Sequence, residues 1–398
     1  MAGAPRVRAI QGRAIRKLID VRAPVERALL IGAPRKGHGG PEASHVEEQL
    51  DELARLADTA GAQVVGRVVQ FIAKPTPDLY IGHGKAVEVA GRVVDLGASL
   101  VIFDEELSPR QGKHLEDLLK VRVMDRAELI LDIFAHRARS REAKMQVELA
   151  QLGYSLPRLT RMWVHLSRIR GGIGLRGPGE TQLETDRRMI RRKIGVLKQK
   201  LAEVTEHRER LRAHTRDRDV LRVALVGYTN AGKSSLLKAL TGTDAYVEDR
   251  LFATLDTQSR EIRLPRTPNP QSPTPALRLR ITDTVGFIRK LPHDLVASFR
   301  ATLEEVADAD VVVHVVDASH PAWEEQMDVV GEALAEIVAP DRVVVSLNKC
   351  DLLSSDEQAA RLRDGVARGV PAHLVSAKTG NGLVQLEVAA VTVGRSVT

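Results

Sequence analysis

The pattern of apolar and polar residues changes twice along this chain and divides it into three parts. In the first part, from about residue 27 to residue 134, short apolar runs alternate with amphipathic stretches. The apolar runs predict strands at 28–32, 64–71 and 100–105. The amphipathic stretches predict helices at 45–61, 84–96 and 108–120. Strand–helix alternation of this kind predicts a parallel sheet flanked by helices.

The middle part has the periodicity of packed helices. After Asp186 the apolar residues follow at intervals of 4, 3, 4, 3 and 7, as in a heptad repeat; they are Ile190, Ile194, Leu197, Leu201, Val204 and Leu211. An earlier segment, 142–152, offers a matching apolar face of Met145, Leu149 and Leu152. We therefore expect a long antiparallel helical hairpin, with a glycine-rich loop at 170–182 in its tip region.

The third part, from about residue 220, returns to strand–helix alternation. Its apolar runs predict strands at 222–227, 277–284, 309–318 and 341–349. A polar, proline-rich segment at 266–276 is expected as a hairpin tip, and the final segment, 384–398, as a poor terminal helix. The expected organisation is α/β, in four segments: a basic tail at 1–26, a parallel-sheet α/β domain at 27–136, a basic helical hairpin at 137–219 and a second α/β domain at 220–398.

Composition sets the class of protein. A chain of 398 residues favours two or three domains of roughly 150 residues each. Cys350 is the only cysteine, so no internal disulfide is expected, as in a reducing cytosol. No apolar run is long enough to span a membrane, and the N-terminus favours a basic tail over a signal or transit peptide. We expect a cytoplasmic protein, with partial peripheral membrane association left open.

Positive charge is concentrated in the middle part. Residues 137–218 hold 21 Lys and Arg against 9 Asp and Glu, a net charge of +12, whereas the whole chain carries +7. This concentration favours a nucleic-acid partner over a merely solvated helical face. The candidate RNA-contacting residues are Arg170, Arg176, Arg187, Arg188, Arg191 and Arg192.

The sequence GYTNAGKS at 227–234 fits the phosphate-loop pattern G-x-x-x-x-G-K-[ST]. It follows an apolar run and opens an amphipathic one, which is the strand–loop–helix context that this loop requires. The glycines let backbone N–H groups approach phosphates, and a helix N-terminus adds partial positive charge. Lys233 is expected to reach the β- and γ-phosphates and the Ser234 hydroxyl to bind Mg²⁺. By itself the motif indicates a nucleoside triphosphate.

Three further short patterns follow, each at the end of an apolar run. In DTVG (283–286), Asp283 can hold the Mg²⁺ shell through water and the Gly286 N–H can bond a γ-phosphate. In NKCD (348–351), Asp351 can accept N1–H and N2–H of guanine, which adenine cannot supply. SAK (376–378) can close over the base. Together the four patterns predict a guanine-nucleotide site at the carboxyl edge of a sheet.

These motifs carry a family resemblance. The third part resembles the translation-factor-like class of Ras-fold GTPases, and residues 27–385 resemble the HflX family of ribosome-associated GTPases. The resemblance rests on GYTNAGKSSL, LFATLD, DTVGFIRKLPHDLV, NKCD, SAK and GGIGLRGPGETQLETDRR. It implies a Ras-like P-loop GTPase domain at 220–398. The expected GTP contacts are Gly227, Tyr228, Thr229, Asn230, Ala231, Gly232, Lys233, Ser234, Ser235, Phe252, Ala253, Thr254, Leu255, Asp256, Asp283, Thr284, Val285, Gly286, Asn348, Lys349, Asp351, Ser376, Ala377 and Lys378.

The resemblance adds one residue and several partners. It implies Thr254 as the switch threonine that binds Mg²⁺ and the γ-phosphate, where the sequence alone leaves Thr257 as a competitor. The expected catalytic residues are then Lys233, Thr254 and Gly286. The implied partners are the large ribosomal subunit, its rRNA and, at a site not located, ATP; a monomer is expected. Relatives often extend further at the C-terminus, so contacts made by that extension are in doubt.

Phe287 occupies the position where a GTPase of the usual type has a water-positioning glutamine. Either the domain is an inert GTP-sensing switch, or a partner supplies the missing group. The resemblance favours the second reading, with the ribosome as activator and a role in ribosome splitting, recycling or biogenesis. Two other functions stay open: an RNA-binding module with a structural GTPase domain, and a regulatory GTPase with a non-ribosomal protein partner.

Overall fold

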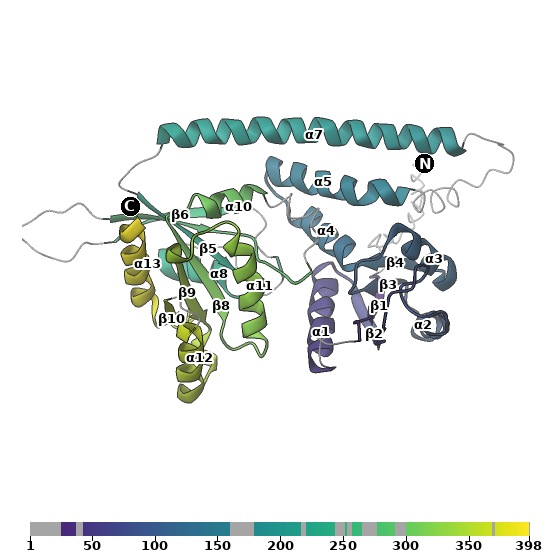
Figure 1. Ribbon diagram of the computed structural model, residues 1–398, viewed down its shortest axis with the longest axis horizontal. Coiled ribbons are helices and arrows are strands. Elements are labelled where there is room, and N and C mark those ends of the chain that lie inside the picture. The colour runs from purple at the N-terminus through teal and green to yellow at the C-terminus, as the bar shows by residue number, and fades with distance from the viewer. Residues whose placement is uncertain are drawn as a thin grey trace, which may run out of the picture.

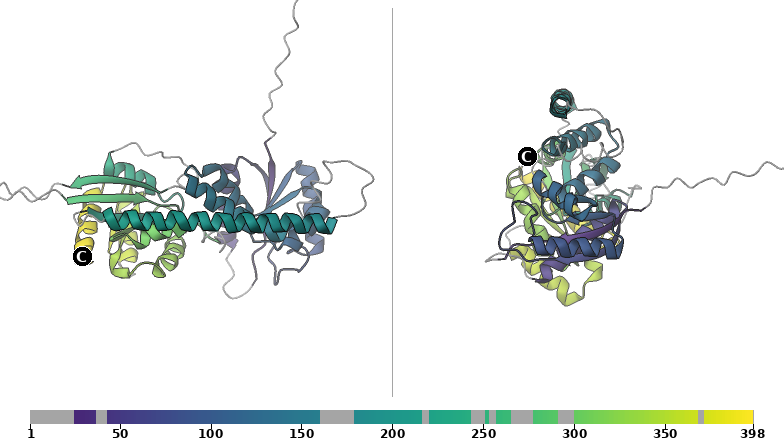
Figure 2. Two further views of the ribbon diagram at one scale, coloured as in Figure 1. Left: turned by 90° about the horizontal axis from the view of Figure 1, so that it is seen from above. Right: turned by 90° about the vertical axis from the view of Figure 1, so that its right-hand side faces the viewer.

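The computed structural model describes residues 25–36, 43–159, 179–215, 220–242, 251–252, 257–264, 277–290, 300–367 and 371–397. In these residues two sheet-containing domains lie next to one another, and one long helix runs across both (Figures 1 and 2). We call the first the N-terminal domain and the second, which carries GYTNAGKS, the P-loop domain. None of the described helices is both long and apolar enough to cross a membrane.

The N-terminal domain is a parallel four-stranded sheet with two helices on each face. Its strands run in the order β2-β1-β3-β4 and are β1 (Arg27–Gly32), β2 (Gln63–Val69), β3 (Leu100–Phe103) and β4 (Arg122–Asp125). Its helices are α1 (Ala43–Thr59), α2 (His83–Leu96), α3 (Pro109–Leu119) and α4 (Arg126–Arg137). Helices α1 and α4 cover one face, and α2 and α3 cover the other. The predicted parallel sheet is confirmed.

Side-chain caps fix where helices of this domain begin. The Ser108 hydroxyl accepts the Gln111 N–H (3.3 Å) and the Gln111 side chain accepts the Ser108 N–H (2.9 Å), a capping box at the start of α3. Asp125 caps α4 by accepting the Glu128 N–H at 2.9 Å. Strand β4 and helix α4 were not expected from the sequence, because the short strand passes directly into the helix with no loop to separate the two patterns.

Two antiparallel helices connect the domains. They are α5 (Arg141–Ser155), which ends in the 3-10 turn η1 (Leu156–Arg158), and α7 (Gly179–Thr215). Leu197 of the heptad seam is buried, and α7 forms ion pairs with α5 from Lys193 to Glu148 and from Arg208 to Glu142, each at 2.5 Å. Residues 179–182 were expected in a loop, but they form the first turn of α7, which begins at Gly179. Residues 170–178 lie outside the described residues.

The P-loop domain is a six-stranded sheet in the order β10-β9-β8-β5-β7-β6. Its strands are β5 (Val220–Gly227), β6 (Gln258–Leu264), β7 (Leu277–Asp283), β8 (Val311–Asp317), β9 (Val343–Asn348) and β10 (Ala372–Leu374). Among the strands in the described part of this domain, only β6 is antiparallel to its neighbour. Its helices are α8 (Lys233–Thr241), α10 (Arg300–Ala307), α11 (Trp323–Ala335), α12 (Ser355–Ala367) and α13 (Leu383–Val397), with 3-10 turns η3 (Pro340–Arg342) and η4 (Cys350–Leu352). The expected hairpin tip at 266–276 lies outside the described residues.

Helix α13 corrects the expectation of a poor terminal helix. Its valines and threonine have low helix propensity, but Leu386 and Ala390 are buried against the sheet. Gly394 lies so close to β5 that a Cβ atom there would be 2.4 Å from Cδ1 of Leu221. Burial of this face stabilises the helix more than propensity opposes it.

Replacing Gly394 by leucine is expected to destabilise the protein by about 1–3 kcal/mol, because added atoms overpack this contact. The change would be measured as a lower urea midpoint at unchanged slope. Val388→Leu on the same helix, where the side chain is 60% exposed, is the matched control and should shift stability by less than about 0.5 kcal/mol. Equal midpoints for both variants would contradict the packing of α13.

Candidate nucleotide-binding site

Two positions of the loop between β5 and α8 have to be glycine, because neighbouring atoms leave no room for a Cβ atom. A Cβ atom at Gly227 would lie 2.1 Å from the carbonyl oxygen of Val315, and one at Gly232 would lie 2.3 Å from Nδ2 of Asn348. Gly232 also has a left-handed backbone, with φ of 93°. Helix α8 begins directly after it, at Lys233. The first N–H groups of the helix therefore border the loop, where they can bind an anion.

Lys233 is the charged group at the centre of this loop. Its side chain is buried, and Nζ donates to the carbonyl oxygens of Gly227 (3.1 Å) and Tyr228 (2.9 Å). Burial lowers the pKa of Lys233 to about 8, and the carboxylate of Asp283 opposes that shift. A phosphate beside Nζ would add negative charge and favour the ammonium form. The arrangement suits a lysine that becomes fully charged with its ligand.

A hydroxyl and a carboxylate meet beside the loop. Ser234, in the first turn of α8, donates to Oδ2 of Asp283 at 2.6 Å, and Asp283 ends strand β7 with 1% of its surface exposed. Hard oxygen ligands of this kind are those that Mg²⁺ prefers. The donor set therefore fits the expected metal site.

Thr254, the threonine expected to complete that metal site, lies outside the described residues, as do Ala253, Leu255 and Asp256. Its competitor Thr257 is described, and its hydroxyl donates to Oε1 of Glu305 on α10 at 3.3 Å. Phe252 is also described, and its N–H donates to Oγ1 of Thr229 in the P-loop at 3.1 Å. The segment 251–256 thus begins in contact with the P-loop.

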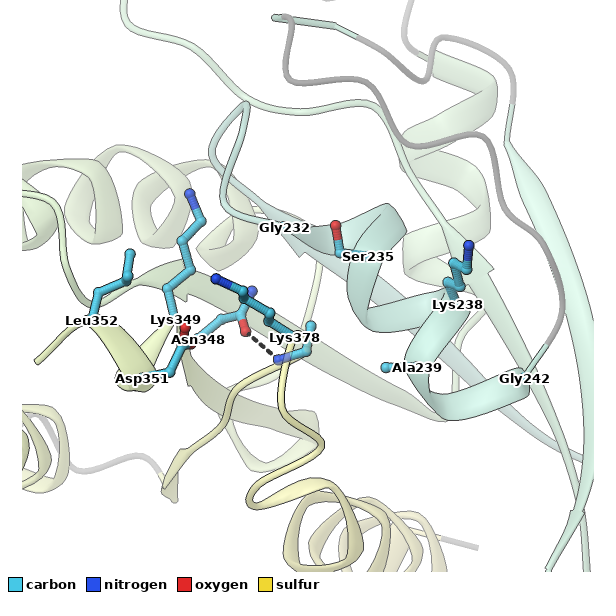
Figure 3. Close-up of a pocket in the computed structure, with 11 residues that line it drawn as sticks. Gly232, Ser235, Lys238, Ala239, Gly242, Asn348, Lys349, Asp351, Leu352 and Lys378 are labelled. Atoms are coloured by element: carbon cyan, nitrogen blue, oxygen red, sulfur yellow. Dashed lines mark hydrogen bonds between the residues drawn. The ribbon is translucent and has the colours of Figure 1, made fainter.

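A cavity of about 650 Å³ opens at the carboxyl edge of the sheet, between α8 and the segments after β9 and β10 (Figure 3). Asn348 connects its walls, since Nδ2 donates to the Ala231 carbonyl (2.9 Å) and Oδ1 accepts the Ala377 N–H (3.1 Å). The Ser376 hydroxyl donates to Oδ1 of Asp351 at 2.6 Å and orients that carboxylate. The lining residues are Gly232, Ser235, Lys238, Ala239, Gly242, Asn348, Lys349, Asp351, Leu352, Ala377 and Lys378.

The fold brings NKCD, SAK and the P-loop together at this cavity, as the sequence predicts. Some residues that were expected to contact GTP have side chains that do not face the cavity. Thr284 and Val285 are buried, and the Thr284 hydroxyl donates to the Leu225 carbonyl at 2.8 Å. The Tyr228 side chain leaves the loop and contacts the N-terminal domain. None of these three residues is among those that line the cavity.

The backbone of Phe287 is bound to the P-loop. Its N–H donates to the Gly227 carbonyl (3.0 Å), and its carbonyl accepts the Thr229 N–H (2.7 Å). Its partly buried ring packs against the apolar cluster that contains Phe252 and Ile288. Gly286 lies beside it, where a Cβ atom would be 3.0 Å from Nζ of Lys233. Phe287 therefore has a packing role in this structure.

Helix α7 carries the described part of the expected RNA-contacting set. Arg188, Arg191 and Arg192 are exposed, and Arg187 is half-buried. Arg170 and Arg176 lie outside the described residues. The exposed arginines lie within four residues of one another on one helix, so their charges act on the same ligand surface.

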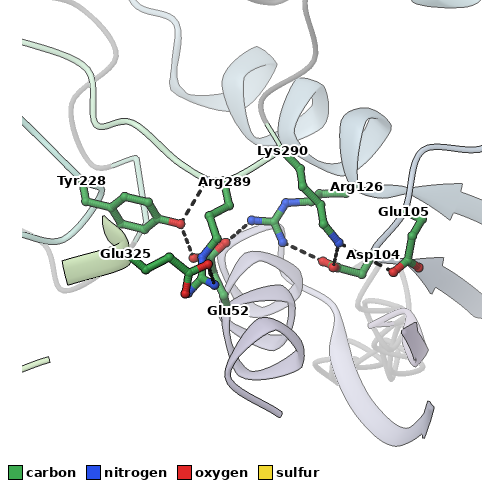
Figure 4. A network of polar contacts seen from close by, with 8 residues as sticks. All are labelled: Glu52, Asp104, Glu105, Arg126, Tyr228, Arg289, Lys290 and Glu325. Carbon is green, nitrogen blue, oxygen red and sulfur yellow. Dashed lines mark hydrogen bonds and ion pairs between the residues drawn. The ribbon is translucent and has the colours of Figure 1, made fainter. Parts of the chain in front are cut away.

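A polar network across the domain boundary was missed from the sequence (Figure 4). Arg126 of α4 is buried and pairs with Glu52 and, at 2.7 Å, with Asp104. Glu52 accepts the Tyr228 hydroxyl at 2.5 Å, and Asp104 pairs with Lys290. The only local signal was the acidic end of the predicted strand 100–105. Glu52 and Lys290 have no periodic pattern or motif that would single them out.

Models of known protein families match successive parts of the chain. They are described as GTP-binding GTPase N-terminal (residues 47–135), GTP-binding GTPase Middle Region (137–215) and 50S ribosome-binding GTPase (222–349). The crystal structure of SsGBP in complex with GDP has the same fold, with a TM-score of 0.51 and 24% identity over 94% of this chain and 99% of that chain.

Similar curated proteins carry the name GTPase HflX. One from Caldanaerobacter subterraneus subsp. tengcongensis is 51% identical over 308 residues, which is 77% of this chain and 70% of that protein. One from Escherichia coli K12 is 45% identical over 341 residues, 85% of this chain and 77% of that protein. With the P-loop fold, these relatives define the class: the chain is a GTPase, an enzyme whose substrate is GTP. Within that class it belongs to the HflX family.

Asp351→Asn is expected to weaken GDP binding by about 10²-fold or more, because the charge-assisted pair of hydrogen bonds to guanine N1–H and N2–H is lost. Titration calorimetry with GDP would measure the change. Asp341→Asn, at an exposed carboxylate in η3, makes the same chemical change away from the cavity and should leave the affinity unaltered. Unchanged GDP affinity in the Asp351 variant would contradict the assignment of the guanine pocket.

His314, in β8 beneath the P-loop, makes stability depend on pH. Burial and, to a smaller extent, the nearby Lys233 charge lower the pKa of His314 from an ordinary 6.5 to about 4. Between these values the unfolded chain binds a proton that the folded chain rejects, so stability falls as pH drops from 7 toward 4. The difference in urea midpoint between wild type and His314→Gln is expected to narrow over that range. A constant difference at every pH would contradict the burial of a neutral imidazole.

Proposed function

We propose that this chain is a Mg²⁺-dependent GTPase that binds the large ribosomal subunit in its GTP state and acts in ribosome splitting, recycling or biogenesis. The observation that carries the ribosomal part is the exposed arginine face of α7, formed by Arg188, Arg191 and Arg192. The helix itself runs across both domains (Figure 1). A basic helical face suits the phosphates of rRNA. The match to a family described as 50S ribosome-binding GTPase supports the same partner.

Each proposed site residue has one task in this reaction. Lys233 neutralises charge on the β- and γ-phosphates, and the Gly286 N–H donates to the γ-phosphate. Ser234, Thr254 and, through water, Asp283 would hold Mg²⁺, which would supply positive charge to the phosphate oxygens. Asp351 selects guanine, and Asn348 keeps the base pocket joined to the P-loop.

Hydrolysis is proposed to depend on the ribosome. The Phe287 ring can neither donate to nor accept from an attacking water, and both backbone groups of this residue are already bound to the P-loop. A catalytic group supplied by a partner accelerates GTP hydrolysis by about 10³–10⁵-fold in related systems. The isolated chain is therefore expected to hydrolyse GTP slowly, and large subunits are expected to raise the rate.

Co-sedimentation with large ribosomal subunits tests this function. More protein should pellet with a non-hydrolysable GTP analogue than with GDP, and binding should weaken steeply as salt rises. The double variant Arg188→Glu/Arg191→Glu should lose most of this binding, while a matched reversal at the exposed residues Arg363→Glu/Arg395→Glu should keep it.

Each alternative outcome identifies a different function. Equal pelleting with GDP and the analogue would favour an RNA-binding module with a structural GTPase domain. Absence of pelleting with the analogue would favour a non-ribosomal partner. Equal GTPase rates with and without large subunits would refute ribosome-stimulated hydrolysis.

A further inference from the structure

The charged end of Lys349 is held by a carboxylate that does not line the cavity. Lys349 is the second residue of NKCD and lines the cavity, and its ammonium points away from Asp351 (Figure 3). That ammonium pairs with Oδ2 of Asp317 at 2.6 Å. Asp317 ends strand β8, beside Asn348 at the end of β9, and is not among the residues that line the cavity. A residue outside the lining therefore holds a side chain that forms part of the wall.

The carboxylate of Asp317 is itself fixed by the turn that follows β8. Its other oxygen, Oδ1, accepts the Ser319 hydroxyl at 2.6 Å and the Ser319 N–H at 3.1 Å. The Asp317 carbonyl accepts the His320 N–H at 3.2 Å. Asp317 is buried, with 9% of its surface exposed. The turn thus uses one carboxylate oxygen and presents the other to Lys349 in a set direction.

The backbone of Lys349 is in an unfavourable conformation that surrounding contacts must hold. Its φ is 61°, in the left-handed region that residues other than glycine rarely adopt. Its aliphatic stem also passes close to the P-loop, because a Cβ atom at Gly232 would lie 4.0 Å from Cε of Lys349. The pair with Asp317 therefore fixes the far end of a side chain whose stem lies against the phosphate-binding loop.

The stem of Lys349 offers apolar surface to a purine in a cavity that has little of it. Among the described residues that line the cavity none is aromatic, and its apolar surface comes largely from Leu352 and from lysine stems. A lysine stem can pack on apolar surface while its ammonium stays paired or hydrated. A guanine whose edge bonds to Asp351 has its planar face free to pack on such a stem. The position of Lys349 therefore bears directly on how well the base fits.

We propose that Asp317 is a positioning residue for guanine-nucleotide binding, which holds the Lys349 ammonium and so keeps the lysine stem in place as a wall against the face of the base. The inference rests on the proposed guanine pocket and adds to it a residue that touches neither the base nor the phosphates. A lysine without this partner would have to be ordered when the nucleotide binds, which lowers the affinity. With Asp317 present, the side chain is already ordered before binding.

Titration calorimetry of the full-length chain with GDP tests this role through Asp317→Asn. The amide oxygen can still accept from Ser319, so the turn is kept, whereas the charge that holds Lys349 is removed. GDP affinity is expected to fall about two- to tenfold, the effect of ordering one long side chain on binding. Asp341→Asn makes the same chemical change at an exposed position and should leave the affinity unaltered.

A double-mutant cycle with Lys349→Met separates positioning from a general structural role. Methionine keeps an unbranched apolar side chain but has no ammonium for Asp317 to hold. Asp317→Asn is therefore expected to weaken GDP binding in the wild-type background and to cause no further loss beside Lys349→Met. Ser319→Ala, which loosens the Asp317 carboxylate and keeps its charge, should follow the same pattern with a smaller loss. Equal losses in both backgrounds, or an unaltered affinity for Asp317→Asn alone, would overturn the proposal.

Inosine diphosphate, which lacks the N2 amino group of guanine, distinguishes the face of the base from its edge. Asp317→Asn is expected to weaken GDP and inosine diphosphate by the same factor, because the Lys349 stem packs on the face. A larger loss for GDP would place the effect at Asp351 and overturn the wall. Failure of wild type to bind GDP, or unaltered GDP affinity for Asp351→Asn, would instead overturn the guanine pocket itself.

Discussion

A single buried guanidinium, that of Arg126, holds contacts together on both sides of the domain boundary. Its side chain is 3% exposed and pairs with Glu52 and Asp104. Burial opposes its charge, but the two carboxylates outweigh burial and raise the pKa of Arg126. Each carboxylate also reaches the P-loop domain, Glu52 at Tyr228 and Asp104 at Lys290. Since removing one partner of a buried pair leaves an uncompensated charge, the placement of the P-loop domain is tied to charge pairing inside its neighbour.

The nucleotide-binding motifs could be predicted because each is a local pattern with one chemical purpose. Gly227 and Gly232 recur at the spacing of a loop that must pass close to Val315 and Asn348, and no other residue type fits there. The alternation of strands and helices likewise predicted two α/β domains; the first has a parallel sheet, and the second has one antiparallel strand, β6. The sequence motifs were least decisive at the switch threonine. Thr254 and Thr257 are chemically identical and close in sequence, so only the family resemblance favours Thr254.

The features that could not be predicted depend on contacts between residues that are far apart in the sequence. Glu52 looks like an ordinary polar position of an amphipathic helix, and Tyr228 occupies a variable position of the P-loop motif, yet they meet across 176 residues of sequence. From the sequence, Phe287 indicated only that a water-positioning side chain is absent, and its packing role could not be predicted because its partners come from other segments. Helix α13 was underestimated for the same reason, since Leu386 and Ala390 are helical through burial that local propensity does not record.

The length and attachment of α7 have a mechanical consequence. The helix has 37 residues, about 55 Å at 1.5 Å per residue, and four residues separate its end from β5. Strand β5 then leads straight into the P-loop. Helix α7 is therefore coupled mechanically to the P-loop through β5, as a long lever arm is to its pivot. A small rotation of α7 relative to the N-terminal domain would be transmitted along β5 toward Gly227 at the start of the P-loop.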